Sequence, residues 1–156
     1  MGREYIVSFE KVSVSAVQDL FQIIGAAGMI LEIKRFNIDC VDTTAPTNQQ
    51  LALRCRFLPA TVTNGSGGSS PTPQKVDNGD PAATFTAKAN NTTQATTSGT
   101  ASTKWEGGCN VFSGVEKYFT EPIIVGPSQA FTVELITATS GTLTLSGSVS
   151  VTEKGG

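Results

Sequence analysis

Hydrophobic and polar residues alternate with a period of two along much of this chain. The alternation is clear over residues 3–16, 29–42 and 49–58, and it returns between residues 131 and 151. Because successive side chains of a β-strand point to opposite faces, this pattern predicts strands with one face in a core and one face toward water. The sequence therefore predicts an all-β protein.

Residues 16–24 fit two interpretations. Val17, Leu20, Phe21 and Ile24 have the spacing of one helical face, but the run is short and rich in β-branched and aromatic residues. Periodicity alone does not separate a helical turn from a strand over so short an apolar run. We favour a strand here.

The apolar phase changes inside two of the predicted strands. In residues 3–16 it shifts near Glu10-Lys11, and in residues 29–42 it shifts near Lys34-Arg35. A slip of one residue would turn every later side chain to the wrong face, so a strand that keeps its core face must contain an extra residue. We expect a break at the first position and a β-bulge at the second.

Two strand pairs stand out in the pattern. We expect residues 29–42 and 49–58 to pair as the antiparallel centre of the fold, and residues 131–135 and 143–151 to form a hairpin. Gly147 lies in the middle of the last strand. A glycine in that position indicates a bulge or a close neighbour.

Residues 59–81 interrupt the alternation with a polar segment rich in glycine and proline. Pro71, Pro73 and Pro81 each lack a backbone donor, which keeps them out of the interior of a sheet. We predict a long exposed loop that joins two blocks of strands and becomes ordered at a contact with a partner.

These signals together predict about eight strands and no convincing helix. The expected fold is one domain over residues 1–156, an antiparallel β-sandwich of the jelly-roll or Greek-key kind. The composition agrees, because only 38% of residues are hydrophobic and 15% are charged, with Ser, Thr, Gly and Asn making up the difference. The periodicity does not specify the strand order.

Charge and hydropathy limit the partners that we expect. The net charge is −2 and no basic run is present, whereas nucleic-acid binding needs a concentrated positive face. No apolar run approaches the roughly 18–20 residues that cross a bilayer, and the first residues lack the basic-then-apolar pattern of a secretory signal. We therefore expect synthesis in the cytoplasm and neither a nucleic-acid nor a membrane partner.

The residues that carry chemistry are sparse. The chain has no histidine and three cysteines, none in a close Cys-x-x-Cys spacing, so we expect no zinc and no imidazole base. Asp77-Asn78-Gly79-Asp80 resembles half of a calcium loop, but such clusters are typical of turns. Cys40 and Cys55 fall in phase with apolar neighbours and are interpreted as small buried hydrophobic residues. We expect no cofactor and no enzymatic activity.

Two groups of side chains allow both a functional and a structural interpretation. Trp105 and Tyr118 could form a sugar platform or an interface anchor, but core packing is the favoured interpretation for this cluster. Arg54 and Arg56 share one predicted outward face and could bind carboxylates of a partner; a solvated face is the favoured interpretation.

Several stretches of the chain together resemble a known family. They are QDLFQI (18–23), GSGGSSPTPQKVDNGDPAA (65–83) and ANNTTQAT (89–96). In this order the chain resembles the head decoration, or cement, proteins of tailed bacteriophages over roughly residues 18–151. The resemblance implies a jelly roll on the outer surface of the capsid, as a homotrimer that bridges neighbouring major capsid proteins, with no catalytic residues. Residues 1–17 are not clearly part of the pattern.

Two functional hypotheses follow. The first is a structural protein that stabilises a phage head, and the alternative is a carbohydrate- or receptor-binding module of a tail fibre or adhesin. The residues that we expect at an interface are Tyr5, Arg54, Arg56, Pro71, Pro73, Lys75, Asp80 and Trp105.

Overall fold

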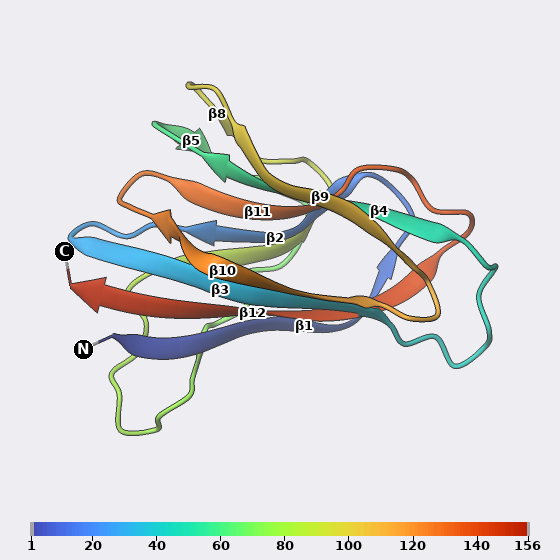
Figure 1. The fold of residues 1–156 in the computed structure, drawn as a ribbon, viewed down its shortest axis with the longest axis horizontal. Coiled ribbons are helices and arrows are strands. Elements are labelled where there is room, and N and C mark those ends of the chain that lie inside the picture. The colour runs from blue at the N-terminus through green and yellow to red at the C-terminus, as the bar shows by residue number, and fades with distance from the viewer. Residues whose placement is uncertain (1, 156) are drawn as a thin grey trace.

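The computed structural model describes residues 2–155, and those residues form strands and no helix. Figure 1 shows two layers of long strands with both termini at one end of the molecule. The strands are β1 (Arg3–Val14), β2 (Gln18–Ile24), β3 (Met29–Cys40), β4 (Gln50–Leu58), β5 (Val62–Thr63), β6 (Gln74–Lys75), β7 (Thr86–Asn91), β8 (Thr96–Thr97), β9 (Ser102–Asn110), β10 (Val115–Val125), β11 (Ala130–Leu135) and β12 (Leu143–Gly155). The strand predicted over residues 16–24 is confirmed by β2.

The strand order is that of a jelly roll. Sheet A has the order β10-β3-β12-β1-β6, and sheet B has the order β7-β2-β11-β4-β9. Strands β1 to β4 alternate between the sheets, and β9 to β12 return beside them, so β12 lies between β1 and β3 while β11 lies between β2 and β4. All of these pairings are antiparallel. The predicted fold class is confirmed.

Both predicted strand pairs are wrong. β3 belongs to sheet A and β4 to sheet B, so they face each other across the core and do not pair. The same is true of β11 and β12, which do not form a hairpin. The reason is that a period of two shows which side of a strand is buried, and that side is the same whether the next strand lies beside it or opposite it.

The core lies between the inward faces of the two sheets. Aromatic side chains from both sheets contact one another there: the ring centroid of Phe36 is 5.7 Å from that of Trp105 and 6.3 Å from that of Phe119. Phe21 and Phe36 are fully buried. Burying one such large apolar side chain contributes about 1.5–3 kcal/mol to the free energy of unfolding.

The structure confirms the predicted irregularities. The pairing of β1 with β12 shifts between Phe9 and Val12, around Glu10-Lys11. In β3, Arg35 pairs with Ser150 and Ile33 pairs with the next residue of β12, which leaves Lys34 as an extra, bulged residue. Gly147 has a close neighbour, because a Cβ there would lie 2.7 Å from Ile38 Cδ1.

The residues between β4 and β9 form an insertion that covers the outer face of sheet B. Its first part contacts its second part through the backbone bridges Ser66–Thr93 and Ser69–Ala89 and through the β5–β8 pair. Gln22 of β2 accepts a hydrogen bond from the backbone N–H of Gly65 at 3.1 Å. All six residues of β11 are buried, although only one face of this strand meets the core between the sheets. The insertion therefore buries the other face.

The predicted loop at residues 59–81 is ordered within the chain itself. Its later part runs along the edge of sheet A, where Lys75 of β6 pairs with Tyr5. The segment is fixed beyond β6 as well, because the Tyr5 hydroxyl donates to the carbonyl of Pro81 at 3.1 Å. As predicted, the prolines stay outside the sheet interior.

Candidate functional site

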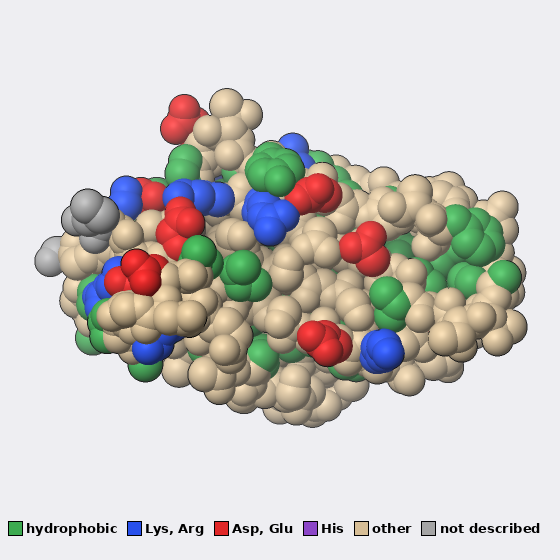
Figure 2. Space-filling view, turned by 90° about the horizontal axis from the view of Figure 1, so that it is seen from below, with side chains coloured by type: hydrophobic (Ala, Val, Ile, Leu, Met, Phe, Trp, Pro, Cys, Tyr) green, Lys and Arg blue, Asp and Glu red, His purple; other side chains and the backbone are tan. Residues whose placement is uncertain are grey.

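The outer face of sheet A is the large sheet face that the chain leaves uncovered. Along β12, the residues that alternate with the buried core positions from Leu143 to Val149 are half-buried Thr and Ser. Figure 2 looks onto this side of the molecule and shows charged side chains of both signs gathered at the end nearest the termini. The outer face of sheet A is therefore open to a partner.

A groove crosses this open face where two irregularities coincide. The bulge in β3 leaves Lys34 without a pairing partner in β12. At the same place β3 pairs with β10 on its other edge, where Tyr118 pairs with Arg35 and the next pair is Ile123 with Ile33. Residues 119–122 of β10 therefore lie opposite the single residue Lys34 of β3. Bulges redirect side chains and bend strands, and they are frequent beside functional sites. Here they form one wall of a groove of about 560 Å³.

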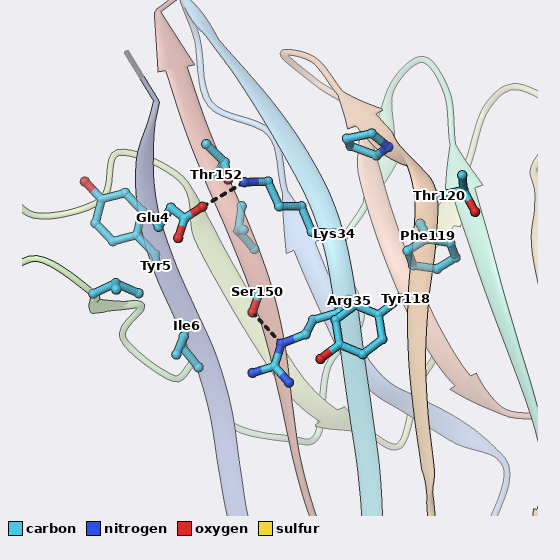
Figure 3. A pocket seen from close by; sticks show the side chains of 13 residues that line it. Glu4, Tyr5, Ile6, Lys34, Arg35, Tyr118, Phe119, Thr120, Ser150 and Thr152 are labelled. Atoms are coloured by element: carbon cyan, nitrogen blue, oxygen red, sulfur yellow. Dashed lines mark hydrogen bonds and ion pairs between the residues drawn. The ribbon is translucent and has the colours of Figure 1, made fainter.

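The bulge places two cations side by side on the groove. Ile33 and Phe36 point into the core and are fully buried, so Lys34 and Arg35 between them both extend over the outer face (Figure 3). Lys34 Nζ contacts Glu4 Oε1 at 2.7 Å. The ion pair lowers the pKa of Glu4, so this carboxylate stays ionised at neutral pH.

Arg35 is fixed by three neighbours. Its Nε donates to Ser150 Oγ at 3.2 Å and its Nη1 donates to Glu116 Oε1 at 2.6 Å. Its guanidinium lies 5.9 Å from the ring centroid of Tyr118, in the range of a cation–π contact. Tyr118 in turn donates its hydroxyl to Glu116 at 3.0 Å, and its side chain is 62% exposed. The site thus presents an exposed aromatic ring beside a hydrogen-bonded arginine and glutamate.

The remaining lining of the groove is apolar or carries hydroxyl groups. Ile6 and Val76 lie on the β1–β6 side, Pro122 lies on the β10 side, and Ser150 and Thr152 of β12 lie between them. Val76 is 55% exposed. This lining suits an apolar or hydroxyl-bearing group and offers no arrangement of nucleophile, base and orienting group.

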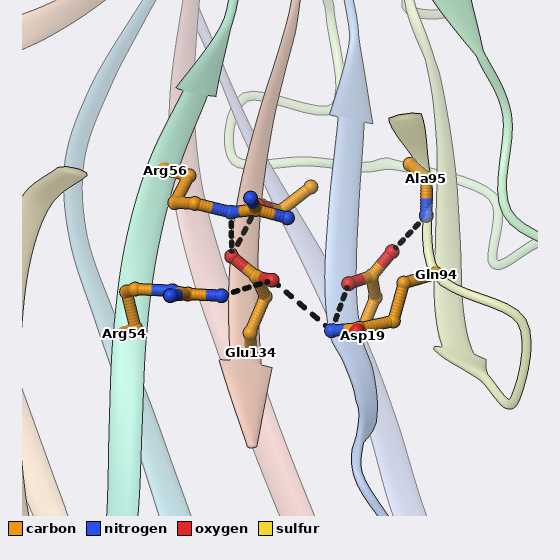
Figure 4. Close-up of polar contacts among 7 residues, drawn as sticks. Asp19, Arg54, Arg56, Gln94, Ala95 and Glu134 are labelled. Atoms are coloured by element: carbon orange, nitrogen blue, oxygen red, sulfur yellow. Dashed lines mark hydrogen bonds and ion pairs between the residues drawn. The ribbon is translucent and has the colours of Figure 1, made fainter. Parts of the chain in front are cut away.

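Arg54 and Arg56 lie away from this groove, on the outer face of sheet B. The favoured interpretation of a solvated face is wrong, because both bind the fully buried Glu134 of β11 (Figure 4). Arg56 Nε lies 2.5 Å and Arg54 Nη2 lies 3.3 Å from its carboxylate oxygens. The partner carboxylate is in the same chain, and the sequence did not reveal it because it lies 78 residues further along from Arg56.

A second buried carboxylate, Asp19 of β2, holds the insertion in place. Its Oδ2 accepts the backbone N–H of Ala95 at 2.7 Å, and Gln94 donates to both Asp19 and Glu134 (Figure 4). Burial raises the pKa of Asp19 to about 6, and the negative charge of Glu134 adds to the shift, while the Ala95 hydrogen bond opposes it. This cluster is part of the cover of sheet B.

The other predicted interface residues are divided between the core and the edge of sheet A. Tyr5 is fully buried, and Trp105 is partly buried and packs against the core. Neither ring therefore forms an exposed contact surface for a partner. The remaining predicted residues lie along the segment that borders β1, and they are Pro71, Pro73, Lys75 and Asp80. The structure does not bring Trp105 and Tyr118 onto one surface, because Trp105 contacts Phe36 in the core.

The sequence analysis did not predict the groove, although it predicted the bulge that forms one of its walls. The phase change at Lys34-Arg35 predicts the bulge, and a bulge puts two consecutive side chains on one face. The second wall could not be predicted, since the departure of residues 119–122 from β3 is visible only once the two strands are known to pair.

Over residues 2–155 no group of three or more acidic, cysteine or histidine side chains is placed to hold a metal ion. Within the same residues, no helix has the length and apolar character needed to cross a bilayer. The three cysteines form no disulfide; Cys55 and Cys109 are buried and Cys40 is half-buried. Burial raises the pKa of each of the three thiols.

Comparison of the chain with protein-family models, with curated proteins and with solved structures found no match. What is shown is the class: an all-β sandwich of two antiparallel sheets.

Proposed function

We propose that this chain is a non-catalytic capsid decoration protein, which binds the outside of a phage head and stabilises neighbouring major capsid proteins. The observation that carries the proposal is the asymmetry of the sandwich. Its own insertion covers the outer face of sheet B over β2 and β11, while the outer face of sheet A stays open and carries a preformed groove. A rigid module with one open face is suited to a mechanical role.

The sequence resemblance supports the same proposal. Two of the stretches that carry it, residues 65–83 and 89–96, lie in the insertion and contact each other at Ser66–Thr93 and Ser69–Ala89. They belong to the cover of sheet B and to the edge of sheet A, so the resemblance concerns how the module is built. It leaves the partner-binding face to be identified from the geometry.

The size of the molecule is compatible with several contacts at once. Stable interfaces bury about 800 Å² on each partner, which is about a tenth of the 7380 Å² that this chain exposes. The exposed surface is large enough for each copy of a homotrimer on the outer capsid surface to contact both its neighbours and the major capsid protein. In this proposal the chain is made in the host cytoplasm and resides in the virion.

Quantitative mass spectrometry of purified virions tests the proposal. We expect a copy number in simple ratio to the major capsid protein, and heads that lack the chain should break at a lower temperature. A few copies per virion would move the protein to the tail. Complete absence from virions, or heads equally resistant to heat without it, would refute a decoration role.

Limited proteolysis tests the predicted contact of residues 59–81 with a partner. Lys75 is exposed in the isolated chain, and we expect trypsin to cleave there more slowly on assembled particles than in the purified protein. Equal cleavage rates would contradict a contact at this segment.

The alternative function, a carbohydrate- or receptor-binding module, is favoured by one observation, the exposed ring of Tyr118 in a groove that also carries hydroxyl groups. Aromatic rings with a free face stack on sugars. Glycan screening with wild-type protein and with Tyr118→Ala separates the two functions. A sugar signal that the substitution abolishes supports the alternative, and no signal in the wild-type protein rejects it.

A further inference from the structure

We infer that the groove of sheet A receives an extended segment of the major capsid protein, which inserts an uncharged apolar side chain beside Tyr118. The inference rests on the proposed function and names the surface and the chemistry through which that function would be carried out. None of the interface residues expected from the sequence is an exposed anchor in this groove.

The first argument is where exposed hydrophobic side chains lie. Tyr118 is 62% exposed and Val76 is 55% exposed, and both line the groove, one from β10 and one from the segment that follows β6. Ile6 and Pro122 extend the apolar lining between them. Three strands of sheet A separate Tyr118 from Val76, so an extended segment that crosses the groove, with one apolar side chain against Tyr118, would cover both.

The second argument is the set of contacts that support the anchor. Arg35 supports the Tyr118 ring at 5.9 Å and is itself held by Ser150 and Glu116. Tyrosine and arginine are enriched among the residues that dominate protein interfaces. Because Arg35 already has these partners in the free chain, a side chain that packs on Tyr118 need not rearrange them.

The third argument concerns charge. Every charged side chain that lines the groove has an opposite partner in the chain: Lys34 binds Glu4 at 2.7 Å, and Arg35 binds Glu116 at 2.6 Å. A charged group of the partner would have to compete with one of these pairs, whereas an uncharged side chain leaves both intact. Binding should therefore depend only weakly on salt, since few counterions are displaced.

The fourth argument is the backbone of β10. Residues 119–122 leave the ladder with β3, and no described strand pairs with them. Thr120 and Pro122 of this stretch line the groove, so a segment that lies along it would pass backbone groups that are in register with no described strand. An extended peptide uses such groups when it adds to a sheet edge, and its alternate side chains then fill the pockets beside it.

The experiment uses heads assembled without this chain and measures the binding of added purified protein. The test variant is Tyr118→Ala, and the matched control is Phe112→Ala, which removes an aromatic ring of nearly equal exposure, 60%, from the turn between β9 and β10. We expect the Kd of Tyr118→Ala to rise at least tenfold, and that of Phe112→Ala to stay within about twofold of wild type. Between 50 mM and 500 mM salt the wild-type Kd should change by less than about threefold.

The outcomes distinguish the inference from the proposed function. Wild-type protein that does not bind heads overturns both. Two results would refute the groove assignment and leave the decoration role intact. One is wild-type binding that Tyr118→Ala does not weaken, and the other is wild-type binding that is lost at high salt. If Tyr118→Ala changes the oligomeric state in solution and leaves head binding intact, the groove joins copies of this chain, and the inference is again overturned. Equal urea midpoints of the three proteins establish that the substitutions leave the fold intact.

Discussion

The pH dependence of stability should be governed in part by Asp19. Its side chain is fully buried, and burial raises its pKa from an ordinary 3.8 to about 6. The folded state therefore holds this proton more tightly than the unfolded state does. Between about pH 4 and pH 6 the folded chain binds more protons at this site, so the free energy of unfolding falls as the pH rises.

The magnitude follows from the shift. A change of roughly two units in pKa corresponds to about 3 kcal/mol at 1.36 kcal/mol per unit. This is the cost of keeping Asp19 ionised in the folded protein above pH 6. The cost disappears on acidification below the unfolded pKa, where the group is protonated in both states.

The substitution Asp19→Asn removes the titration and nearly preserves the shape of the side chain. The amide has only one acceptor oxygen, so either the bond from Ala95 N or the bond from Gln94 is lost, at a cost of about 1 kcal/mol. That cost is the same at every pH. The difference in unfolding free energy between variant and wild type should therefore move by about 2.5 kcal/mol in favour of the variant between pH 4 and pH 8.

Urea unfolding at several pH values measures this difference. Asp42→Asn provides a control of opposite sign, because hydrogen bonds from Thr144 and from Cys40 lower the pKa of Asp42, so its ionised form is the stabilising one. That variant should lose stability relative to wild type at neutral pH and approach wild type on acidification. An Asp19→Asn difference that stays constant from pH 4 to pH 8 would refute the reasoning.

Two further predictions concern the packing of the sandwich. Arg56→Met removes the nearest cation from the fully buried Glu134 and should lower the free energy of unfolding by about 3 kcal/mol. Arg54→Met should lower it less, because the Arg54–Glu134 contact is 3.3 Å long and the Arg56–Glu134 contact is 2.5 Å long. Equal urea midpoints for the two variants would contradict this order. Gly147→Ala should cost about 1–3 kcal/mol through overpacking, since its Cβ would lie 2.7 Å from a side-chain carbon. Gly155→Ala, where a Cβ meets nothing within 4 Å, should stay within about 0.5 kcal/mol of wild type in the same assay.

The sequence by itself determined the class of the fold and several of its details. Alternation over residues 3–16, 29–42 and 49–58 predicts the strands, because the face that a strand buries depends on its own side chains. The phase changes predict the break at Glu10-Lys11 and the bulge at Lys34-Arg35 for the same local reason. Each of these features can be deduced without knowing which strand lies next to which.

The tertiary structure decided which strands pair and what lies on their outer faces. β3 and β4 carry the pattern of a pair yet join different sheets. Arg54 and Arg56 look like a solvated face, but residues distant in sequence bring Glu134 beneath them and the insertion over the sheet. The groove needs β3, β10 and β12 together. Contacts between segments far apart in the chain create these features, and a period of two contains no information about such contacts.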